Sequence, residues 1–256
     1  MILYEKKEGV AYIKFNRPTV FNSCNRAMAF EIQNALDDAA ADHDVRAIYI
    51  TGEGKAFCAG QDLGEIVDPN GPNLSVILTE HYNPIVERLR NISKPIVAAV
   101  NGVAAGAGAN LALACDIVVA TESASFIQAF SKIGLIPDSG GTFFLPRLIG
   151  FQKASALMLL GDKISAVEAE RMGMIYKYFS DDTFVAESLT IVKTLAAMPT
   201  LGLGLTKRAL NQSMTNNLTE QLDVENTLQT QAGHSADYNE GVNAFLEKRK
   251  PIFKGN

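Results

Sequence analysis

Short apolar runs of strand type alternate with helical stretches along the first part of the chain, and this alternation constrains the fold more than any other feature. Residues 10–15 and 45–50 are apolar runs of strand length, and residues 27–36 between them place apolar side chains at helical spacing. Residues 95–100 form a further apolar run, which a short helix near Asn110 follows. The alternation predicts an α/β fold in which strands and helices stack around a mainly parallel sheet.

A hairpin and a long loop complete this part of the chain. Residues 2–4 and 10–15 flank the turn Glu8-Gly9, which predicts a β-hairpin. Residues 53–71 are rich in glycine and aspartate, so we expect a loop there. A helix is predicted from about residue 74 to residue 89.

Beyond Gly150 the spacing of apolar residues becomes almost wholly helical. The last sixty or so residues therefore form a helical layer, and we divide the chain into a core over residues 1–195 and a C-terminal helical segment over residues 196–256. The stretches with helical spacing are residues 153–160, 166–172, 184–198, 202–214 and 218–233.

Composition excludes several classes of protein. With 256 residues, 47% hydrophobic content and 20% charge, the chain can bury a substantial core, and its net charge of -5 argues against a nucleic-acid-binding surface. Cys24, Cys58 and Cys115 lie far apart without metal-ligand spacing, so we expect no metal site, no disulfide frame and a reducing compartment. No signal peptide or apolar run of membrane length is present, which favours a cytoplasmic protein without a membrane partner.

Two glycine-containing turns are candidates for binding a negative charge. Residues 101–110 leave a strand and open a helix with almost no side chains, so their amides can approach a ligand closely. Close packing of a tight turn explains that run equally well. Residues 56–62 follow another strand and offer a second exposed amide. Two convergent amides would form an oxyanion hole, in which each donor contributes about 3 kcal/mol to transition-state stabilisation.

Four motifs, in order along the whole chain, resemble the crotonase, or enoyl-CoA hydratase/isomerase, superfamily. The resemblance implies a crotonase-like spiral of strand-strand-helix units over residues 1–195 and a helical oligomerisation segment over residues 196–256. It also implies that the amides of Gln61 and Ala107 hold the thioester oxygen of an acyl-CoA substrate. Coenzyme A is then part of the substrate, and no separate cofactor is expected. The motifs are Lys55–Leu63, Lys94-Pro95 with the glycine-rich turn, Gly134–Thr142, and Glu240-Gly241 with Ala244–Arg249.

The acids and bases of the family are only partly present. Hydratases of this family use two glutamates, which the motifs match to Asn110 and Phe130. Neither side chain can transfer a proton, so hydration is disfavoured. Asp138 remains. Local sequence alone favours a helix-capping role for this aspartate, whereas the family resemblance implies a base whose pKa an apolar pocket would raise.

The resemblance also implies two sets of contacts with the substrate. Asn110, Phe130, Tyr82, Gly60 and Gly106 are candidates for contact with the acyl group. Helices of the C-terminal segment imply a homotrimer or a dimer of trimers. Residues expected along coenzyme A are Val20, Phe21, Ala59 and Asp62, with Lys250 and Phe253 reaching it from the C-terminal helix or from a neighbouring subunit.

Further stretches resemble one subfamily, the ring-1,2-epoxyphenylacetyl-CoA isomerases of phenylacetate degradation. These stretches are residues 104–109, 129–138, 199–205 and 235–238. In that subfamily both glutamates are also missing and an aspartate at the position of Asp138 is the base. We therefore expect an acyl-CoA isomerase. Two alternatives remain: a hydratase or double-bond isomerase acting on aliphatic enoyl-CoA in fatty-acid metabolism, and a non-catalytic acyl-CoA-binding or RNA-binding relative.

Overall fold

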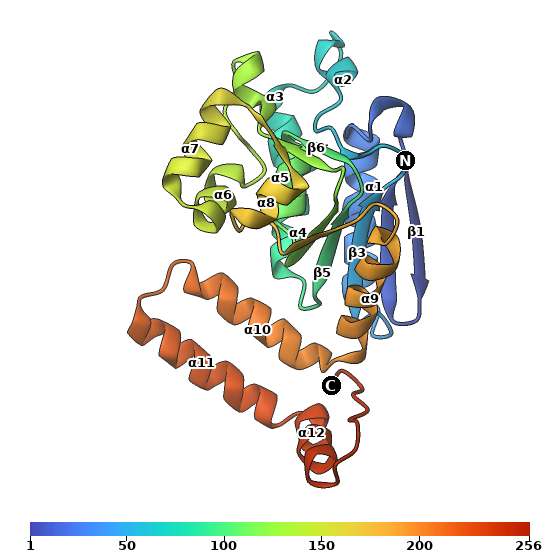
Figure 1. The fold of residues 1–256 in the computed structure, drawn as a ribbon, viewed down its shortest axis with the longest axis vertical. Helices are drawn as coiled ribbons and strands as arrows, with labels where there is room; N and C mark the ends of the chain where they lie inside the picture. The colour runs from blue at the N-terminus through green and yellow to red at the C-terminus, as the bar shows by residue number, and fades with distance from the viewer.

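The computed structural model describes residues 1–256 and contains two sheets with helices around them, as expected for the α/β class (Figure 1). The larger sheet has the strand order β1-β2-β3-β5-β7-β10 and the smaller has the order β4-β6-β8-β9. The strands are β1 Ile2–Lys7, β2 Val10–Phe15, β3 Ala47–Gly52, β4 Ala56–Cys58, β5 Ile96–Val100, β6 Val103–Ala105, β7 Ile117–Thr121, β8 Ser125–Ile127, β9 Lys163–Ser165 and β10 Lys177–Phe179.

The chain repeats one path between the two sheets, which confirms the expected spiral. The pairs β3-β4, β5-β6 and β7-β8 each begin in the larger sheet and end in the smaller one. Within each sheet these neighbouring strands are parallel, and helical segments lead from the smaller sheet back to the larger. The carboxyl ends of β4 and β6 therefore lie side by side, and the two glycine-containing turns follow them.

Helices cover the sheets and form the C-terminal segment. Asn25 caps α1 by accepting a hydrogen bond from the amide of Met28, in agreement with the sequence pattern. The helices are α1 Arg26–Ala41, α2 Leu63–Val67, α3 Leu74–Val76, α4 Asn83–Asn91, α5 Ala107–Leu113, α6 Gly141–Ile149, α7 Phe151–Leu160, α8 Ala166–Arg171, α9 Phe184–Ala197, α10 Thr200–Ser213, α11 Leu218–Gly233 and α12 Ala236–Leu246, with 3-10 turns η1 Pro18–Val20 and η3 Ala129–Ile133 and the π-helical segment η2 Ile77–Tyr82.

The structure departs from the predicted elements in places where strands are short. The predicted loop over residues 53–71 contains β4 and α2, and the almost wholly helical region after Gly150 contains β9 and β10. Strands of three residues are too short to show a period in sequence, and they exist here because neighbouring strands pair with them. The helix predicted over residues 74–89 is present but is interrupted by η2.

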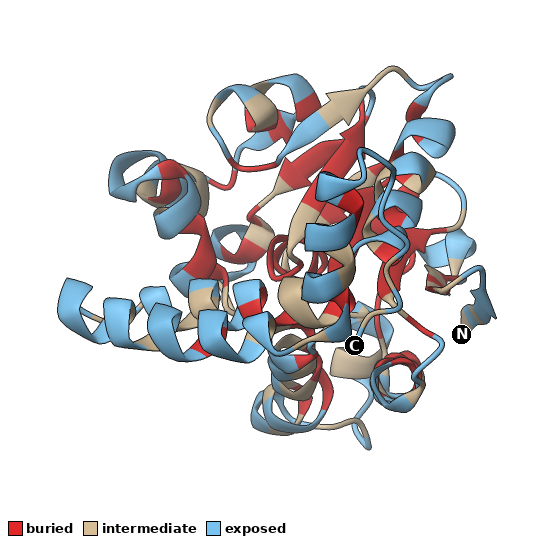
Figure 2. Ribbon diagram, turned by 90° about the horizontal axis from the view of Figure 1, so that it is seen from below, coloured by how far each residue is buried: buried red, intermediate tan, exposed pale blue.

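Burial separates the core from the C-terminal segment (Figure 2). The strands are mostly buried, and α9 packs on the larger sheet through Phe184 and Val192. By contrast, α11 and α12 are largely exposed, and α10 is anchored to the core by the buried Lys207, whose ammonium group lies 2.8 Å from the Asp116 carboxylate. The boundary proposed near residue 195 stays a prediction.

None of the helices is by itself both long enough and apolar enough to cross a membrane. Only α9 and α10 taken together pass a test of length and composition, and they meet at an angle of 105°.

Candidate active site

A cavity of about 860 Å³ opens where the two glycine-containing turns meet the loop that carries Asp138. One wall consists of residues 59–64 after β4 and the start of α5, and the facing wall consists of η3 and residues 135–140. The π-helical segment η2 contributes Ile77, Leu78 and Tyr82. Half of the lining residues are hydrophobic, so the cavity suits an acyl group and strengthens electrostatic interactions inside it.

The two turns touch each other through glycine. A Cβ atom added to Gly60 would lie 2.9 Å from the carbonyl oxygen of Ala105 and 3.4 Å from the amide nitrogen of Ala107. A Cβ added to Gly108 would lie only 2.2 Å from the carbonyl oxygen of Cys58. Side chains at these two positions would push the turns apart, so glycine is what allows α5 to begin directly against β4.

The amides of Gln61 and Ala107 are both free. The neighbours of Gln61 are engaged with Cys24, because the Cys24 amide donates to Gly60 and the Asp62 amide donates to Cys24. The Gln61 amide itself has no partner among the protein's hydrogen bonds. Ala107 is the first residue of α5, so its amide has no acceptor within the helix and lies at the positive end of the helix dipole.

The backbone before Ala107 is unusual. Gly106 has φ 53° and ψ −128°, a conformation that only glycine adopts without strain. Its amide donates to Ile127 at 2.9 Å, which fixes the turn to β8. The direction of the Ala107 amide is therefore set by a backbone conformation that requires glycine and that the bond to β8 holds in place.

Asp138 is the candidate base on the facing wall. Burial raises the pKa of its carboxyl group above the ordinary aspartate range. A hydrogen bond of 2.8 Å from the Ser139 hydroxyl to Oδ1 and one from the backbone amide of Asp138 itself oppose part of that rise. The second carboxylate oxygen makes no hydrogen bond with a side chain. The other carboxylate that lines the cavity, Asp62, forms an ion pair of 2.7 Å with Arg17 and also caps α2.

Two buried side-chain amides, those of Asn110 and Gln128, hold the loop that carries Asp138. Asn110 donates from Nδ2 to the carbonyl oxygen of Asp138 at 2.9 Å and accepts at Oδ1 from Gln128 at 2.8 Å. Asn110 is fully buried and does not line the cavity. It was expected to contact the acyl group. In the structure both ends of its amide bind protein instead, so it supports the backbone of the proposed base.

The other candidate residues fall into two groups. Phe130, Tyr82, Gly60 and Gly106 line the cavity, as do Ala59 and Asp62 of the expected coenzyme A contacts. Val20 and Phe21 are exposed next to this wall, since the Phe21 carbonyl accepts from the amide of Ala59 at 3.0 Å.

Lys250 and Phe253 are not brought to the cavity of their own chain. The carbonyl oxygen of Phe253 accepts from Arg46 at 2.7 Å, and Arg46 precedes β3. The cavity follows the opposite, carboxyl end of that strand. The structure therefore does not bring these two residues to the cavity, and their expected contacts with coenzyme A, from their own chain or from a neighbouring subunit, stay predictions.

Several lining residues were not singled out from the sequence. Ser139 carries the hydroxyl that donates to Asp138, and Lys132 is the lysine on the wall. Leu63, Ile133 and Ile136 are exposed apolar side chains at the cavity. In residues 133–137, glycine and proline interrupt a run of apolar residues, which indicates an exposed apolar loop. The sequence does not show which of these side chains face the cavity.

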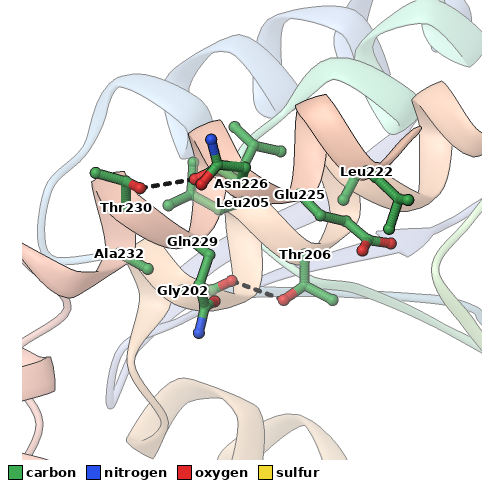
Figure 3. A pocket seen from close by; sticks show the side chains of 11 residues that line it. Gly202, Leu205, Thr206, Leu222, Glu225, Asn226, Gln229, Thr230 and Ala232 are labelled. Atoms are coloured by element: carbon green, nitrogen blue, oxygen red, sulfur yellow. Dashed lines mark hydrogen bonds between the residues drawn. The ribbon is translucent and has the colours of Figure 1, made fainter. Parts of the chain in front are cut away.

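A second hollow, of about 520 Å³, lies between α10 and α11 (Figure 3). The hydroxyl of Thr206 donates to the carbonyl oxygen of Gly202 at 2.9 Å, and that of Thr230 donates to Asn226 at 2.8 Å. Its hydroxyl groups are thus satisfied within their own helices, and Glu225 is its one titratable residue. This hollow lacks groups that could stabilise an oxyanion and move a proton together.

Comparison with known proteins gives one consistent family. Residues 5–256 match the model of the family described as enoyl-CoA hydratase/isomerase. The chain is 48% identical to the 1,2-epoxyphenylacetyl-CoA isomerase of Escherichia coli and 36% identical to the 2,3-dehydroadipyl-CoA hydratase of the same organism, in each case over 99% of this chain and 98% of the relative. The crystal structure of an enoyl-CoA hydratase from Bacillus anthracis superimposes with a TM-score of 0.93 at 33% identity, covering 100% of this chain and 99% of that one.

Proposed function

The chain belongs to the enoyl-CoA hydratase/isomerase family, and from this premise we propose that it is an acyl-CoA isomerase with Asp138 as its single base. The proposal rests on one observation: of the two carboxylates that line the cavity, only Asp138 is available to transfer a proton. Asp138 has a free oxygen and a raised pKa, whereas Asp62 is paired with Arg17. Hydration requires one group to activate water and another to deliver a proton, and the family's glutamate positions hold Asn110 and Phe130.

The proposed reaction moves one proton and leaves the composition of the substrate unchanged. The Asp138 carboxylate removes a proton from the carbon next to the thioester carbonyl, and the electron pair of that bond forms an enolate. The amides of Gln61 and Ala107 donate to the enolate oxygen. The electron pair then returns through the acyl group. In a double-bond shift, protonated Asp138 gives its proton to another carbon. In epoxide opening, a C–O bond breaks, the electron pair ends on the released oxygen, and Asp138 gives its proton to that oxygen. One carboxylate performs both transfers.

We propose ring-1,2-epoxyphenylacetyl-CoA or a related enoyl-CoA as the substrate. The support is the E. coli relative at 48% identity and a half-apolar cavity that suits an aromatic acyl group. Coenzyme A would lie along Val20, Phe21, Ala59 and Asp62 as part of the substrate, so the reaction needs no other cofactor.

We also propose that the C-terminal segment assembles the chain into a homotrimer or a dimer of trimers. The segment exposes large apolar side chains that a single chain leaves uncovered, among them Leu218, Phe245 and Leu246, which are 75%, 83% and 72% exposed. In such an assembly, Lys250 and Phe253 would reach the coenzyme A of a neighbouring subunit.

Two substrates test the proposed function. The purified protein should isomerise ring-1,2-epoxyphenylacetyl-CoA at enzymatic rates and should leave the conjugated thioester absorbance of crotonyl-CoA unchanged at the same protein concentration. Rapid loss of the crotonyl-CoA absorbance, with no conversion of the ring epoxide, would instead identify a hydratase. The hydratase is the second candidate because one relative that spans the whole chain carries that activity in its name.

A further inference from the structure

Tyr82 places a buried side-chain donor without a partner at the wall of the cavity. The side chain is only 1% exposed, and its hydroxyl group has no nitrogen or oxygen partner within the protein; the sulfur of Cys24, a weak acceptor, lies beside it. Among lining residues, the one other buried side-chain atom without a partner is Gln61 Oε1, which can accept but not donate. A buried hydroxyl group without an acceptor destabilises the folded state, so such a group calls for a functional explanation.

The backbone holds Tyr82 firmly. It is the last residue of η2, and π-helical turns of this kind are frequent at functional sites. Gln33 of α1 donates from Nε2 to the carbonyl oxygens of Glu80 and His81, at 2.7 and 3.2 Å. These bonds tie η2 to α1, and Pro84 follows at the start of α4. The tyrosine ring is therefore presented from a fixed segment.

The surroundings of the hydroxyl group keep it protonated. Burial raises the pKa of Tyr82 well above its usual range, and nearby Cys24, Cys58 and Asp138 would raise it further if charged. Tyr82 therefore cannot replace Asp138 as a base at working pH. It can donate a hydrogen bond, and thiol groups such as those of Cys24 and Cys58 are weak acceptors.

Building on the isomerase function proposed above, we infer that the Tyr82 hydroxyl donates a hydrogen bond to an oxygen atom of the acyl group, separate from the thioester oxygen. A hydrocarbon acyl group that fills the cavity would leave this donor without an acceptor. An acyl group with an epoxide or ether oxygen near the reacting carbon would supply one. Sites that offer a buried polar group discriminate strongly against substrates that cannot pair with it. Tyr82 thus selects oxygenated acyl-CoA thioesters, and Asp138 still carries out the proton transfer.

Two measurements on Tyr82→Phe test this inference. The first is kcat/KM for ring-1,2-epoxyphenylacetyl-CoA, whose acyl group carries an oxygen. The second is the rate at which phenylacetyl-CoA, whose acyl group has no oxygen beyond the thioester, exchanges its α-hydrogens in D2O. Exchange requires only the base and the two amides. Tyr238→Phe, at an exposed tyrosine outside the cavity, is the matched control.

We expect Tyr82→Phe to lower kcat/KM for the ring epoxide about 10-fold, the size of one hydrogen bond, and not to lower the exchange of phenylacetyl-CoA by more than about 2-fold. Equal losses in both assays would make Tyr82 a residue that only shapes the site. No loss in either assay would remove it from substrate selection. Both results would overturn the inference while leaving the isomerase proposal intact. If the wild type failed to isomerise the ring epoxide, the proposed function itself would fail, and this inference with it.

Discussion

The cavity beside Asp138 and the hollow between α10 and α11 differ less in size than in what their polar groups bind. In the hollow, the hydroxyl groups of Thr206 and Thr230 are satisfied by carbonyl oxygens one turn earlier. In the cavity, the amides of Gln61 and Ala107 and the hydroxyl of Tyr82 have no nitrogen or oxygen partner in the protein. A carboxyl group with a raised pKa also lies there.

This difference shows that the groups that destabilise the folded state are concentrated around the cavity. Free amides and a buried carboxyl group each destabilise the folded state, and all of them surround the cavity. The α10–α11 hollow has none of these costs and is explained by helix packing alone. The substitutions below compare the two regions by making similar changes in each.

The largest effect is expected from Asp138→Asn. Asparagine keeps the shape of the side chain but cannot take a proton, so turnover of the isomerase substrate should fall by about 10³-fold or more. Binding of the thioester, measured by calorimetry, should remain close to that of the wild type. Asp162→Asn, at an exposed aspartate outside the cavity, should retain full activity. Full activity in Asp138→Asn would remove this residue from the mechanism.

Exchanging glycine for alanine in each region should give opposite results. Gly106→Ala has room for its methyl group, 3.7 Å from Phe130, but cannot keep the backbone conformation that aims the Ala107 amide. We expect kcat to fall about 10²-fold, as for the loss of one oxyanion donor. In Gly202→Ala of α10, the nearest atoms to the new methyl group, those of Pro199, lie 3.9 Å away, so the change should stabilise the helix by up to about 1 kcal/mol. Steady-state kinetics and urea unfolding of both variants measure the two effects. If both variants lost the same fraction of kcat, the proposed difference between the cavity and the hollow would be contradicted.

Asp138→Asn should also stabilise the protein at neutral pH, on the order of 1 kcal/mol. Folding raises the pKa of Asp138, so the ionised carboxylate destabilises the folded state at pH values above that pKa. Below the pKa of the unfolded chain both states are protonated and the penalty disappears. The advantage of the variant should therefore shrink as the pH falls through the pKa of Asp138. Urea unfolding at neutral and mildly acidic pH measures this, and a variant less stable than the wild type at neutral pH would contradict it.

The smallest effect is expected from Ser139→Ala. The Ser139 hydroxyl stabilises the ionised form of Asp138, so its loss should raise the pKa of Asp138 further. The ascending limb of the pH profile of kcat/KM should move to higher pH, with about a 3-fold loss on its acidic side. Thr206→Val in the hollow removes a comparable hydroxyl and should leave the profile unchanged. A shifted pH profile in Thr206→Val, or an unshifted one in Ser139→Ala, would contradict the proposed difference between the cavity and the hollow.

Much of the fold could be predicted because long elements show their period in sequence. The hairpin at Glu8-Gly9, helix α1 with its Asn25 cap and strand β5 follow from such patterns. Strands β4, β6, β8, β9 and β10 could not be predicted, because three residues carry no period and their strand form depends on pairing across the sheet.

The parts of the site that consist of backbone amides could be predicted from the sequence, whereas the side-chain contacts between distant residues could not. Glycine in the turns at Gly60 and Gly106 indicated free amides, and the structure brings those turns together. Asn110 shows the limit. Its partner Gln128 lies 18 residues further along the chain, and only tertiary packing reveals that the pair supports Asp138. Likewise, no local pattern shows that the carbonyl oxygen of Phe253 accepts a hydrogen bond from Arg46, a residue that does not line the cavity.

A crystal structure of the protein with a bound acyl-CoA thioester would test the central claim most directly. The measurement is the pair of distances from the thioester carbonyl oxygen to the amide nitrogens of Gln61 and Ala107. We predict that both fall at about 2.7–3.1 Å, with the free oxygen of Asp138 facing the α-carbon. A carbonyl oxygen that meets only one of these nitrogens, or an Asp138 carboxylate turned away from the α-carbon, would contradict the account.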